Sequence, residues 1–354
     1  MSGRPDILCI SLGTTKGLRV ADEGFAELLR EAGATVAIAA TGIGATNRLR
    51  RGYPVNDIVE AIAGRRAAAS AIAREQPRAV VFSTTTATLL MAPLTVPFAI
   101  RFDAPAALNR PGARNAVLHK LERRRMEQAT LLLPTSRAAV APLAVSTPSV
   151  IVPFPIRASI PYAAASAEAL PRERVAVAYT PDPKAKGLDL LCAAWSDAGI
   201  ADARLDVYGI PAEVARAFLR RRGVPEPAGV RLRGLVPVAE FRAALRSALV
   251  FVSAARWEDF GQAALEAMAD GAVPVCAPAG GPFEALEVTR ALDPALVATD
   301  LAPPALARAL RHAFSLDPHR LATLRAAAEA AAAAYAPEQF VDRLAADVLP
   351  RLVR

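Results

Sequence analysis

Cysteine, histidine and lysine are all scarce in this sequence, and each scarcity narrows the kinds of site that it can build. The three cysteines stand far apart in apolar segments without metal-ligand spacing, which disfavours a disulfide framework and a zinc site. We expect them to be reduced and buried. The 3 histidines are too few for a site that relies on several imidazoles, and we expect them to be structural. The cysteines are Cys9, Cys192 and Cys276, and the histidines are His119, His312 and His319.

Long apolar runs are also missing, and none approaches the length that a bilayer-spanning helix needs. The N-terminal stretch MSGRPDILCISLG lacks a basic region followed by a cleavage site, so we expect a cytoplasmic protein. A hydrophobic content of 53% with 21% charged residues is typical of a soluble globular protein and excludes a disordered one. A length of 354 residues suits two domains.

The formal net charge of +8 favours anionic partners, but arginine supplies almost all of it. Such a compositional bias is weak support for nucleic-acid binding, and aromatic residues do not alternate with the basic ones as stacking on bases requires. We therefore predict no nucleic-acid partner. The basic clusters in the N-terminal half are expected to form a solvated surface. The alternative is peripheral contact with the inner face of an anionic membrane, in which each basic residue contributes ~1 kcal/mol. These clusters comprise Arg48, Arg50, Arg51, Arg65, Arg66 and Arg123 to Arg125.

Short apolar runs alternate with amphipathic or loop segments along the whole chain, which predicts parallel strands covered on both faces by helices. The pattern indicates an α/β protein of two Rossmann-like, doubly wound domains that face each other across a cleft. The predicted strands are 7–13, 35–40, 79–83, 97–102, 130–134 and 149–153 in the first half, and 175–180, 204–209, 230–234, 248–253 and 274–277 in the second.

A stretch rich in proline, alanine and serine separates the two halves and predicts an inter-domain linker. We place the N-terminal domain at 1–155, the linker at 156–174 and the C-terminal domain at 175–336. A final helical segment, 337–354, is predicted to pack back on the N-terminal domain.

The stretch RWEDFGQAALEAMADGAVPV, residues 256 to 275, contains two glutamates eight positions apart around a glycine. The preceding strand ends at Ser253, so Glu258 falls in the loop at the carboxyl edge of the sheet and Glu266 on the helix that follows. Gly261 opens that helix, whose N-terminal amides favour an anion. Carboxylates would repel phosphate, but an ionised carboxylate accepts hydrogen bonds from a diol. The combination predicts a nucleotide-sugar site.

The same residues resemble the E-x7-E motif of retaining glycosyltransferases with the GT-B fold, in particular family 4. The similarity is dense from about residue 175 to 290 and looser before it, where it rests on the glycine loop SLGTTKGLR and the strand order. KGLDLLCAAW, residues 186 to 195, resembles the segment that opens the first helix of the donor domain. The matching positions are Glu258, Phe260, Gly261, Glu266, Ala267, Met268, Ala269, Gly271, Pro274, Val275, Gly280, Gly281 and Glu284.

The resemblance implies roles for several residues in binding the donor sugar nucleotide. Glu266 would hold the ribose hydroxyls, Glu258 would hold the transferred sugar and contribute to catalysis, and Lys186 would neutralise the diphosphate. Reaction would retain the anomeric configuration and need no metal or other cofactor, because cations and helix dipoles stabilise the leaving diphosphate. The remaining donor-binding candidates are Arg256, Phe260, Gly261, Gln262, Gly17 and Arg19.

The sequence departs from the family pattern at two places. An arginine usually precedes the lysine by about five residues, where this chain has Thr180 and Pro181, and Lys184 is the nearest substitute. Many members carry a histidine beside an acidic residue after the fourth strand, where this chain has Phe102 and keeps Asp103. Asp103 is either a helix cap or an acceptor-side catalytic group.

We therefore predict a glycosyltransferase that uses a UDP- or GDP-sugar and an unidentified acceptor. A catalytically impaired relative that binds the nucleotide sugar is the first alternative, given the two departures. A nucleotide-sugar epimerase with the same fold is the second, and it would need more histidines and carboxylates in the cleft.

Overall fold

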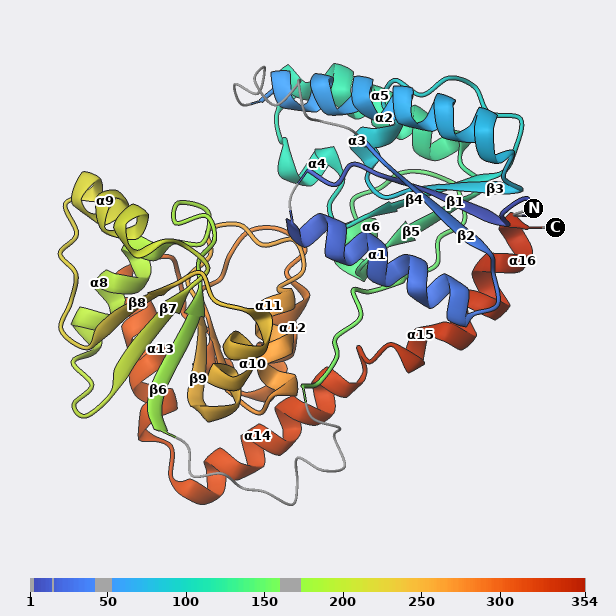
Figure 1. The fold of residues 1–354 in the computed structure, drawn as a ribbon. Coiled ribbons are helices and arrows are strands. Elements are labelled where there is room, and N and C mark those ends of the chain that lie inside the picture. The colour runs from blue at the N-terminus through green and yellow to red at the C-terminus, as the bar shows by residue number, and fades with distance from the viewer. Residues whose placement is uncertain (1–2, 15, 42–52, 160–172, 354) are drawn as a thin grey trace. The chain divides into compact units, whose positions relative to one another are not determined.

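The structure is a computed structural model that describes residues 3–14, 16–41, 53–159 and 173–353 (Figure 1). The chain forms two compact units. Unit 1 comprises Met1–Pro155 and Pro337–Arg354, and unit 2 comprises Ile156–Ala336. The predicted fold class of parallel-sheet α/β domains is confirmed.

Unit 1 contains a five-stranded parallel sheet with the order β2-β1-β3-β4-β5. Its central strands are buried throughout, as expected when helices cover both faces. The elements are β1 (Ile7–Ser11), α1 (Lys16–Glu31), β2 (Val36–Ala40), α2 (Val55–Glu75), β3 (Ala79–Phe82), α3 (Thr85–Thr88), β4 (Phe98–Phe102), α4 (Ala106–Asn109), η2 (Ala113–Asn115), α5 (Ala116–Gln128), β5 (Leu131–Pro134) and α6 (Arg137–Val140).

Helices α2 and α5 lie on one face of this sheet, and α1 lies on the other (Figure 1). Helix α1 packs through Phe25, Leu28 and Leu29, which share one stripe at helical spacing and are all buried. The C-terminal segment returns to the same face as α1, where Leu344, Val348 and other residues join the core cluster. That segment consists of α15 (Glu338–Arg343), a π-helical turn η4 (Leu344–Val348) and α16 (Leu349–Leu352).

A buried polar layer closes the α1 face of unit 1 at the carboxyl ends of its strands. Arg101 of β4 is buried between the rings of Phe25 and Phe154, with its guanidinium carbon 4.8 and 4.6 Å from their centroids. One of its Nη atoms lies 3.6 Å from a carboxylate oxygen of Asp22, and the Asp22 carboxylate also accepts a hydrogen bond from Ser11. Burial raises the pKa of Asp22 above its ordinary value. The interior of this unit therefore contains an ion pair, Arg101 with Asp22.

Unit 2 contains a second five-stranded parallel sheet, with the order β10-β9-β6-β7-β8. Helices α8, α9 and α13 contribute to its largest core cluster, and α10 and α11 pack on the other face (Figure 1). The elements are β6 (Glu173–Tyr179), α8 (Leu188–Ala198), β7 (Arg204–Tyr208), α9 (Ala212–Arg222), β8 (Val230–Gly234), α10 (Val238–Ser247), β9 (Ala248–Ser253), α11 (Gln262–Ala269), β10 (Val273–Cys276), α12 (Glu284–Leu292), η3 (Pro294–Leu296), α13 (Pro303–Ser315) and α14 (Pro318–Ala333).

One predicted strand is wrong. Residues 149–153 form a single isolated bridge, Ser149 with Leu132, although the amides of Val150 and Val152 bond to carbonyls of β5. Pro148, directly before this run, has no amide to donate, so the ladder does not extend in that direction. Most of the predicted linker, 160–172, lies outside the described residues, and β6 begins at Glu173, two residues before the predicted strand.

Candidate active site

The E-x7-E segment forms a loop and a helix at the carboxyl end of β9. Glu258 lies in the loop, with its amide bonded to the carbonyl of Gly280 at 3.0 Å. Phe260 is buried, and its ring meets that of Tyr335 edge-on at 5.9 Å. Gly261 precedes α11, which carries Gln262 in its first turn. The buried ring of Phe260 therefore fixes the loop, while Glu258 stays partly exposed at the edge of the sheet.

Gly261 is required by packing behind the loop. It has a φ of +88°, and a Cβ there would lie 2.3 Å from the Phe283 ring and 2.8 Å from Cβ of Ala285. Its bare Cα therefore faces the protein interior. The first-turn amides of α11 lack intrahelical acceptors, as in any helix, so the N-terminus still favours negative charge.

Lys186 lies in a tight turn between β6 and α8. The Asp182 carboxylate organises the turn by accepting hydrogen bonds from the amides of Lys184 and Ala185, each at 2.9 Å. Gly187 ends it with a φ of +64°, and a Cβ there would lie 2.0 Å from the carbonyl oxygen of Ala254. Close backbone contact thus places the lysine turn against the loop that follows β9.

Lys186 and Glu258 form an ion pair across these two loops. Nζ of Lys186 lies 2.6 Å from Oε2 of Glu258, and the two side chains are 27% and 19% exposed. The structure therefore brings together two residues that are 72 positions apart and were assigned to adjacent parts of the donor, the diphosphate and the sugar. A ligand with both groups can reach them because both side chains remain accessible.

Arg256 occupies the same loop, but its guanidinium is engaged by the protein. It donates to both carboxylate oxygens of Asp189, at 2.8 and 3.0 Å, and to the carbonyl of Lys184 at 3.0 Å. Burial raises the pKa of Asp189, but bonds and charge from Arg256 and Arg222 outweigh it and leave that pKa below its usual value. Asp189 was missed by the sequence interpretation, although it stands three residues after Lys186.

Glu266 lies on α11, half-buried beside a second charged group. Nη1 of Arg242 is 3.9 Å from Oε1 of Glu266, and the amide nitrogen of Gln262 donates to the same oxygen at 3.4 Å. Burial raises the pKa of Glu266 above its ordinary value, and Arg242 offsets that effect only in part. Arg242 also pairs with the buried Asp270. Neither partner was anticipated from the sequence.

The remaining predicted residues belong to unit 1. Gly17 and Arg19 are exposed in the first turns of α1, and the Arg19 side chain passes over Gly13. Asp103 follows β4 and accepts a hydrogen bond from the amide of Ala104 at 2.8 Å, but the N-cap position of α4 is Pro105, so Asp103 does not cap that helix. His119 contacts the carbonyl of Arg110 at 2.9 Å, consistent with a structural role.

The residues at the two departures noted in the sequence are both buried. Thr180, at the usual arginine position, is buried, and its amide bonds to the carbonyl of Tyr208 at 2.8 Å. Phe102, at the usual histidine position, is buried in the unit 1 core. Both positions therefore contribute to packing in this chain.

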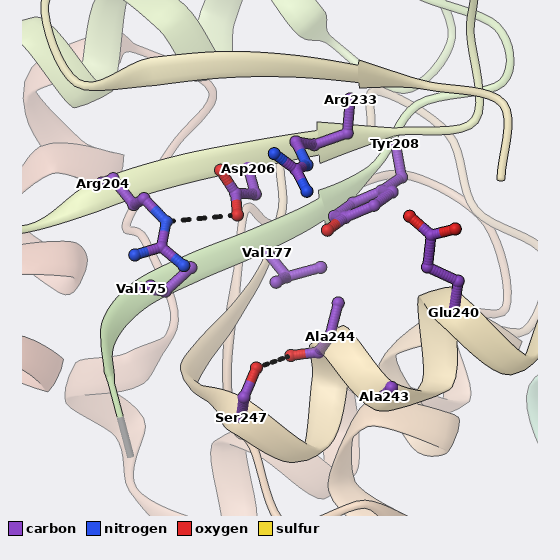
Figure 2. A pocket seen from close by; sticks show the side chains of 10 residues that line it. All are labelled: Val175, Val177, Arg204, Asp206, Tyr208, Arg233, Glu240, Ala243, Ala244 and Ser247. Atoms are coloured by element: carbon purple, nitrogen blue, oxygen red, sulfur yellow. Dashed lines mark hydrogen bonds and ion pairs between the residues drawn. The ribbon is translucent and has the colours of Figure 1, made fainter.

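A separate cavity of about 270 Å³ lies between α10 and the strands β6 to β8 (Figure 2). Its polar lining mixes both signs, with Arg204, Asp206, Arg233 and Glu240 around Val177. Arg204 is paired with Asp206 at 3.3 Å. None of the predicted donor-binding residues lines this cavity, and its mixed charge does not favour a diphosphate.

Among the described residues, no helix is both long enough and apolar enough to cross a lipid bilayer.

Comparison with known proteins places these observations in a family context. Residues 173–315 match the family model described as Glycosyl transferases group 1, and this range runs from β6 to the end of α13. It includes Lys186, Glu258 and Glu266. No curated protein matches the sequence.

Several solved structures share the fold over nearly the whole chain. Sucrose-phosphate synthase from Thermosynechococcus elongatus has a TM-score of 0.73 and 17% identity, and the match covers 96% of each chain. HepE from Anabaena, in complex with UDP-glucose, has a TM-score of 0.71 and 13% identity over 98% of this chain and 99% of that one. WaaG, a glycosyltransferase involved in lipopolysaccharide biosynthesis, has a TM-score of 0.66 and 15% identity over 95% and 98%. The GT-B fold and the prediction of a glycosyltransferase are confirmed.

Proposed function

We propose that the protein is a retaining glycosyltransferase that moves a sugar from a UDP- or GDP-sugar to an acceptor. The observation that carries this proposal is the ion pair of Lys186 and Glu258 at the carboxyl edge of the second sheet, with Glu266 on the helix that follows the same loop. A cation and a helix N-terminus suit the diphosphate, and two carboxylates suit polyol groups. The neighbouring structure of HepE with UDP-glucose supports this class of donor.

Each side chain then has a defined task. Glu266 accepts hydrogen bonds from the ribose diol, and Glu258 accepts them from the hydroxyls of the sugar as positive charge develops on its ring. Lys186 and the first-turn amides of α11 stabilise the departing diphosphate. This arrangement requires no metal ion or other cofactor.

Donor binding and turnover test the proposal together. A thermal-shift screen of UDP- and GDP-linked sugars should identify the donor, since a ligand at ~100 times its Kd adds ~2.7 kcal/mol of stability. NMR of the product, or of the sugar released by slow hydrolysis, should show the donor's anomeric configuration. Inversion at the anomeric carbon would exclude the retaining mechanism.

The same measurements separate the two rivals. An impaired relative would bind the donor and show neither transfer nor hydrolysis. An epimerase would convert one nucleotide sugar into another without an acceptor, which product analysis detects directly.

We also propose that unit 1 contacts an anionic membrane through the N-terminal ends of α2 and α5. Tyr53 donates a hydrogen bond to Asn115, and Arg110 lies 3.6 Å from Asp57, so these two helix ends are adjacent. Apolar side chains are exposed there, with Ile58 52% and Val117 81% accessible. Exposed cations on the same two helices are Arg65, Arg66, Lys120, Arg123 and Arg124, while Arg48, Arg50 and Arg51 lie outside the described residues.

Vesicle flotation tests this contact. The protein should float with phosphatidylglycerol vesicles and much less with phosphatidylcholine vesicles, because both apolar insertion and charge contribute. Replacing Ile58 and Val117 by serine should reduce flotation. Val214→Ser is the matched control, since Val214 is 45% exposed on α9 of unit 2. Equal flotation of all these variants would overturn the assignment of the surface.

A further inference from the structure

We propose that Asp189 and Arg256 form a positioning pair that holds Lys186 and Glu258 at the spacing that the donor requires. The inference rests on the proposed function, because it assigns a task to residues around that site. Arg256, a donor-binding candidate in the sequence, then acts through its neighbours.

Arg256 links three segments of unit 2. Its guanidinium bonds to Asp189 in the first turn of α8 and to the carbonyl of Lys184 in the turn before that helix. Its amide donates to the carbonyl of Ala185 at 2.9 Å, and its carbonyl accepts from Gly280 at 3.3 Å. One residue therefore joins the lysine turn, the helix start and the loop that follows β9.

The two reactive side chains lie directly beside this junction. Lys186 follows Ala185 in the turn, and Glu258 stands two residues after Arg256 in the loop. The 2.6 Å separation of Nζ and Oε2 therefore spans the two segments that Arg256 joins. The fork of Arg256 matches a carboxylate in a single planar arrangement, so it fixes both distance and orientation.

The close backbone approach at Gly187 explains why a bond of this kind is required. The turn and the loop meet there without a side chain between them, since a Cβ on Gly187 would collide with Ala254. Interdigitated side chains therefore cannot fix their relative position at this point. The Asp189 carboxylate is 11% exposed, so its bonds to Arg256 are partly shielded from water.

Lys186 and Glu258 neutralise each other as an ion pair. An ammonium has three donors and a carboxylate has two acceptor oxygens, so each can keep its partner and still receive part of the donor. Both contacts to the donor then depend on the distance between the ammonium of Lys186 and the carboxylate of Glu258. A shift of about 1 Å in such a group can lower turnover by about 100-fold.

Arg256→Lys and Asp189→Asn test the pair, with Arg222→Gln as the matched control. Lysine keeps the charge but loses the planar fork, and asparagine keeps the shape but loses the second acceptor oxygen. Arg222 also bonds to Asp189, at 3.1 Å, but contacts neither Lys184 nor the loop after β9. We expect kcat to fall about 10- to 100-fold in the first two variants and to stay within about 3-fold in the control.

Two further readouts distinguish positioning from simple loss of stability. The double variant Asp189→Asn with Arg256→Lys should be no slower than the slower single variant, because each residue acts through the other. Added guanidinium should restore part of the activity of Arg256→Ala. Additive losses in the double variant, or activity equal to that of Arg222→Gln, would overturn the proposal.

A measurement on the protein without any substrate distinguishes failure of the positioning proposal from failure of the proposed function. The sequence has only Lys16, Lys120, Lys184 and Lys186, so ¹⁵N-lysine labelling gives few ammonium signals. The signal that changes in Glu258→Gln is assigned to Lys186. It should change similarly in Asp189→Asn and Arg256→Lys and remain in Arg222→Gln. If this pattern holds but no nucleotide sugar is turned over, the proposed function fails while the pairing stands; an unchanged signal refutes the pairing itself.

Discussion

The carboxyl ends of the two parallel sheets differ in what they do with their polar residues. In unit 1, Arg101 and Asp22 are 2% and 4% exposed and form part of the interior. In unit 2, Lys186 and Glu258 occupy the corresponding end of the sheet but remain accessible. Ion pairs at similar places in the two sheets thus differ in their exposure. One lies in the interior of its unit, and the other remains accessible.

The difference shows that position at the carboxyl edge alone does not identify a functional residue. Burial decides whether a polar group there can meet a ligand, and the loops around it decide how much is buried. Phe25 and Phe154 cover Arg101, whereas Gly187 and Gly261 keep their loops close to the protein and leave Lys186 accessible. Four variants or treatments probe this contrast.

The largest effect is expected on the stability of unit 1. Arg101→Met should lower the free energy of unfolding by about 3–5 kcal/mol, because it leaves the carboxylate of Asp22 buried without a counter-charge. Urea unfolding measures this change. Arg123→Met is the matched control, since Arg123 is exposed on α5 and its loss should cost less than about 0.5 kcal/mol. Equal stability of both variants would show that the buried pair does not stabilise the unit.

The next effect concerns turnover at the accessible pair. Glu258→Gln should lower kcat about 10- to 100-fold, since a hydrogen bond to a charged group contributes about 1.5–3 kcal/mol. Its urea unfolding curve should stay near that of the wild type because both side chains of the pair remain in contact with water. Glu287→Gln is the control, with Glu287 67% exposed on α12. If Glu258→Gln lost stability and kept its turnover, the contrast between the two sheets would be reversed.

A smaller effect should appear in the pH dependence of donor binding. Burial raises the pKa of Glu266, and only its ionised form accepts both hydrogen bonds from a diol. Affinity should therefore be complete above the raised pKa and fall as pH decreases through it, by at most about tenfold per pH unit. Isothermal titration calorimetry across pH measures this affinity. Glu266→Gln should bind the donor weakly, and its affinity should not change with pH through titration of residue 266. A wild-type profile as flat as that of the variant would contradict the assignment.

The smallest effect is expected from metal removal. Lys186 and the first-turn amides of α11 supply the positive charge that the departing diphosphate needs, so dialysis against EDTA should leave kcat unchanged. Magnesium added back serves as the control for residual chelator. Loss of turnover with EDTA and recovery with magnesium would show that a metal ion provides that charge.

The sequence was sufficient for the fold because its strands are continuous apolar runs that a parallel sheet requires. It was also sufficient to propose Glu258 and Glu266, since both lie in one local motif at a strand end. The run at 149–153 misled the prediction because an apolar composition does not reveal that Pro148 lacks the amide that would extend the ladder.

Other features depend on contacts that no local pattern encodes. Asp189 and Arg256 are 67 positions apart, and nothing in either segment indicates that they meet. The sequence also gives no sign that Arg101 is buried, because arginine is the common basic residue of this chain and is usually exposed. Partners for buried charges become visible only when the fold brings distant segments together.

The return of residues 337–354 to unit 1 determines how the protein can be divided for study. Leu344, Val348 and Leu352 are at most 1% exposed in the core beside α1. A fragment ending at residue 155 would lose their burial, roughly 5–9 kcal/mol, which is comparable with the net stability of an ordinary domain. Expression of that half by itself should therefore yield insoluble material, whereas grafting the tail onto residue 155 through a flexible peptide should yield a folded half-molecule.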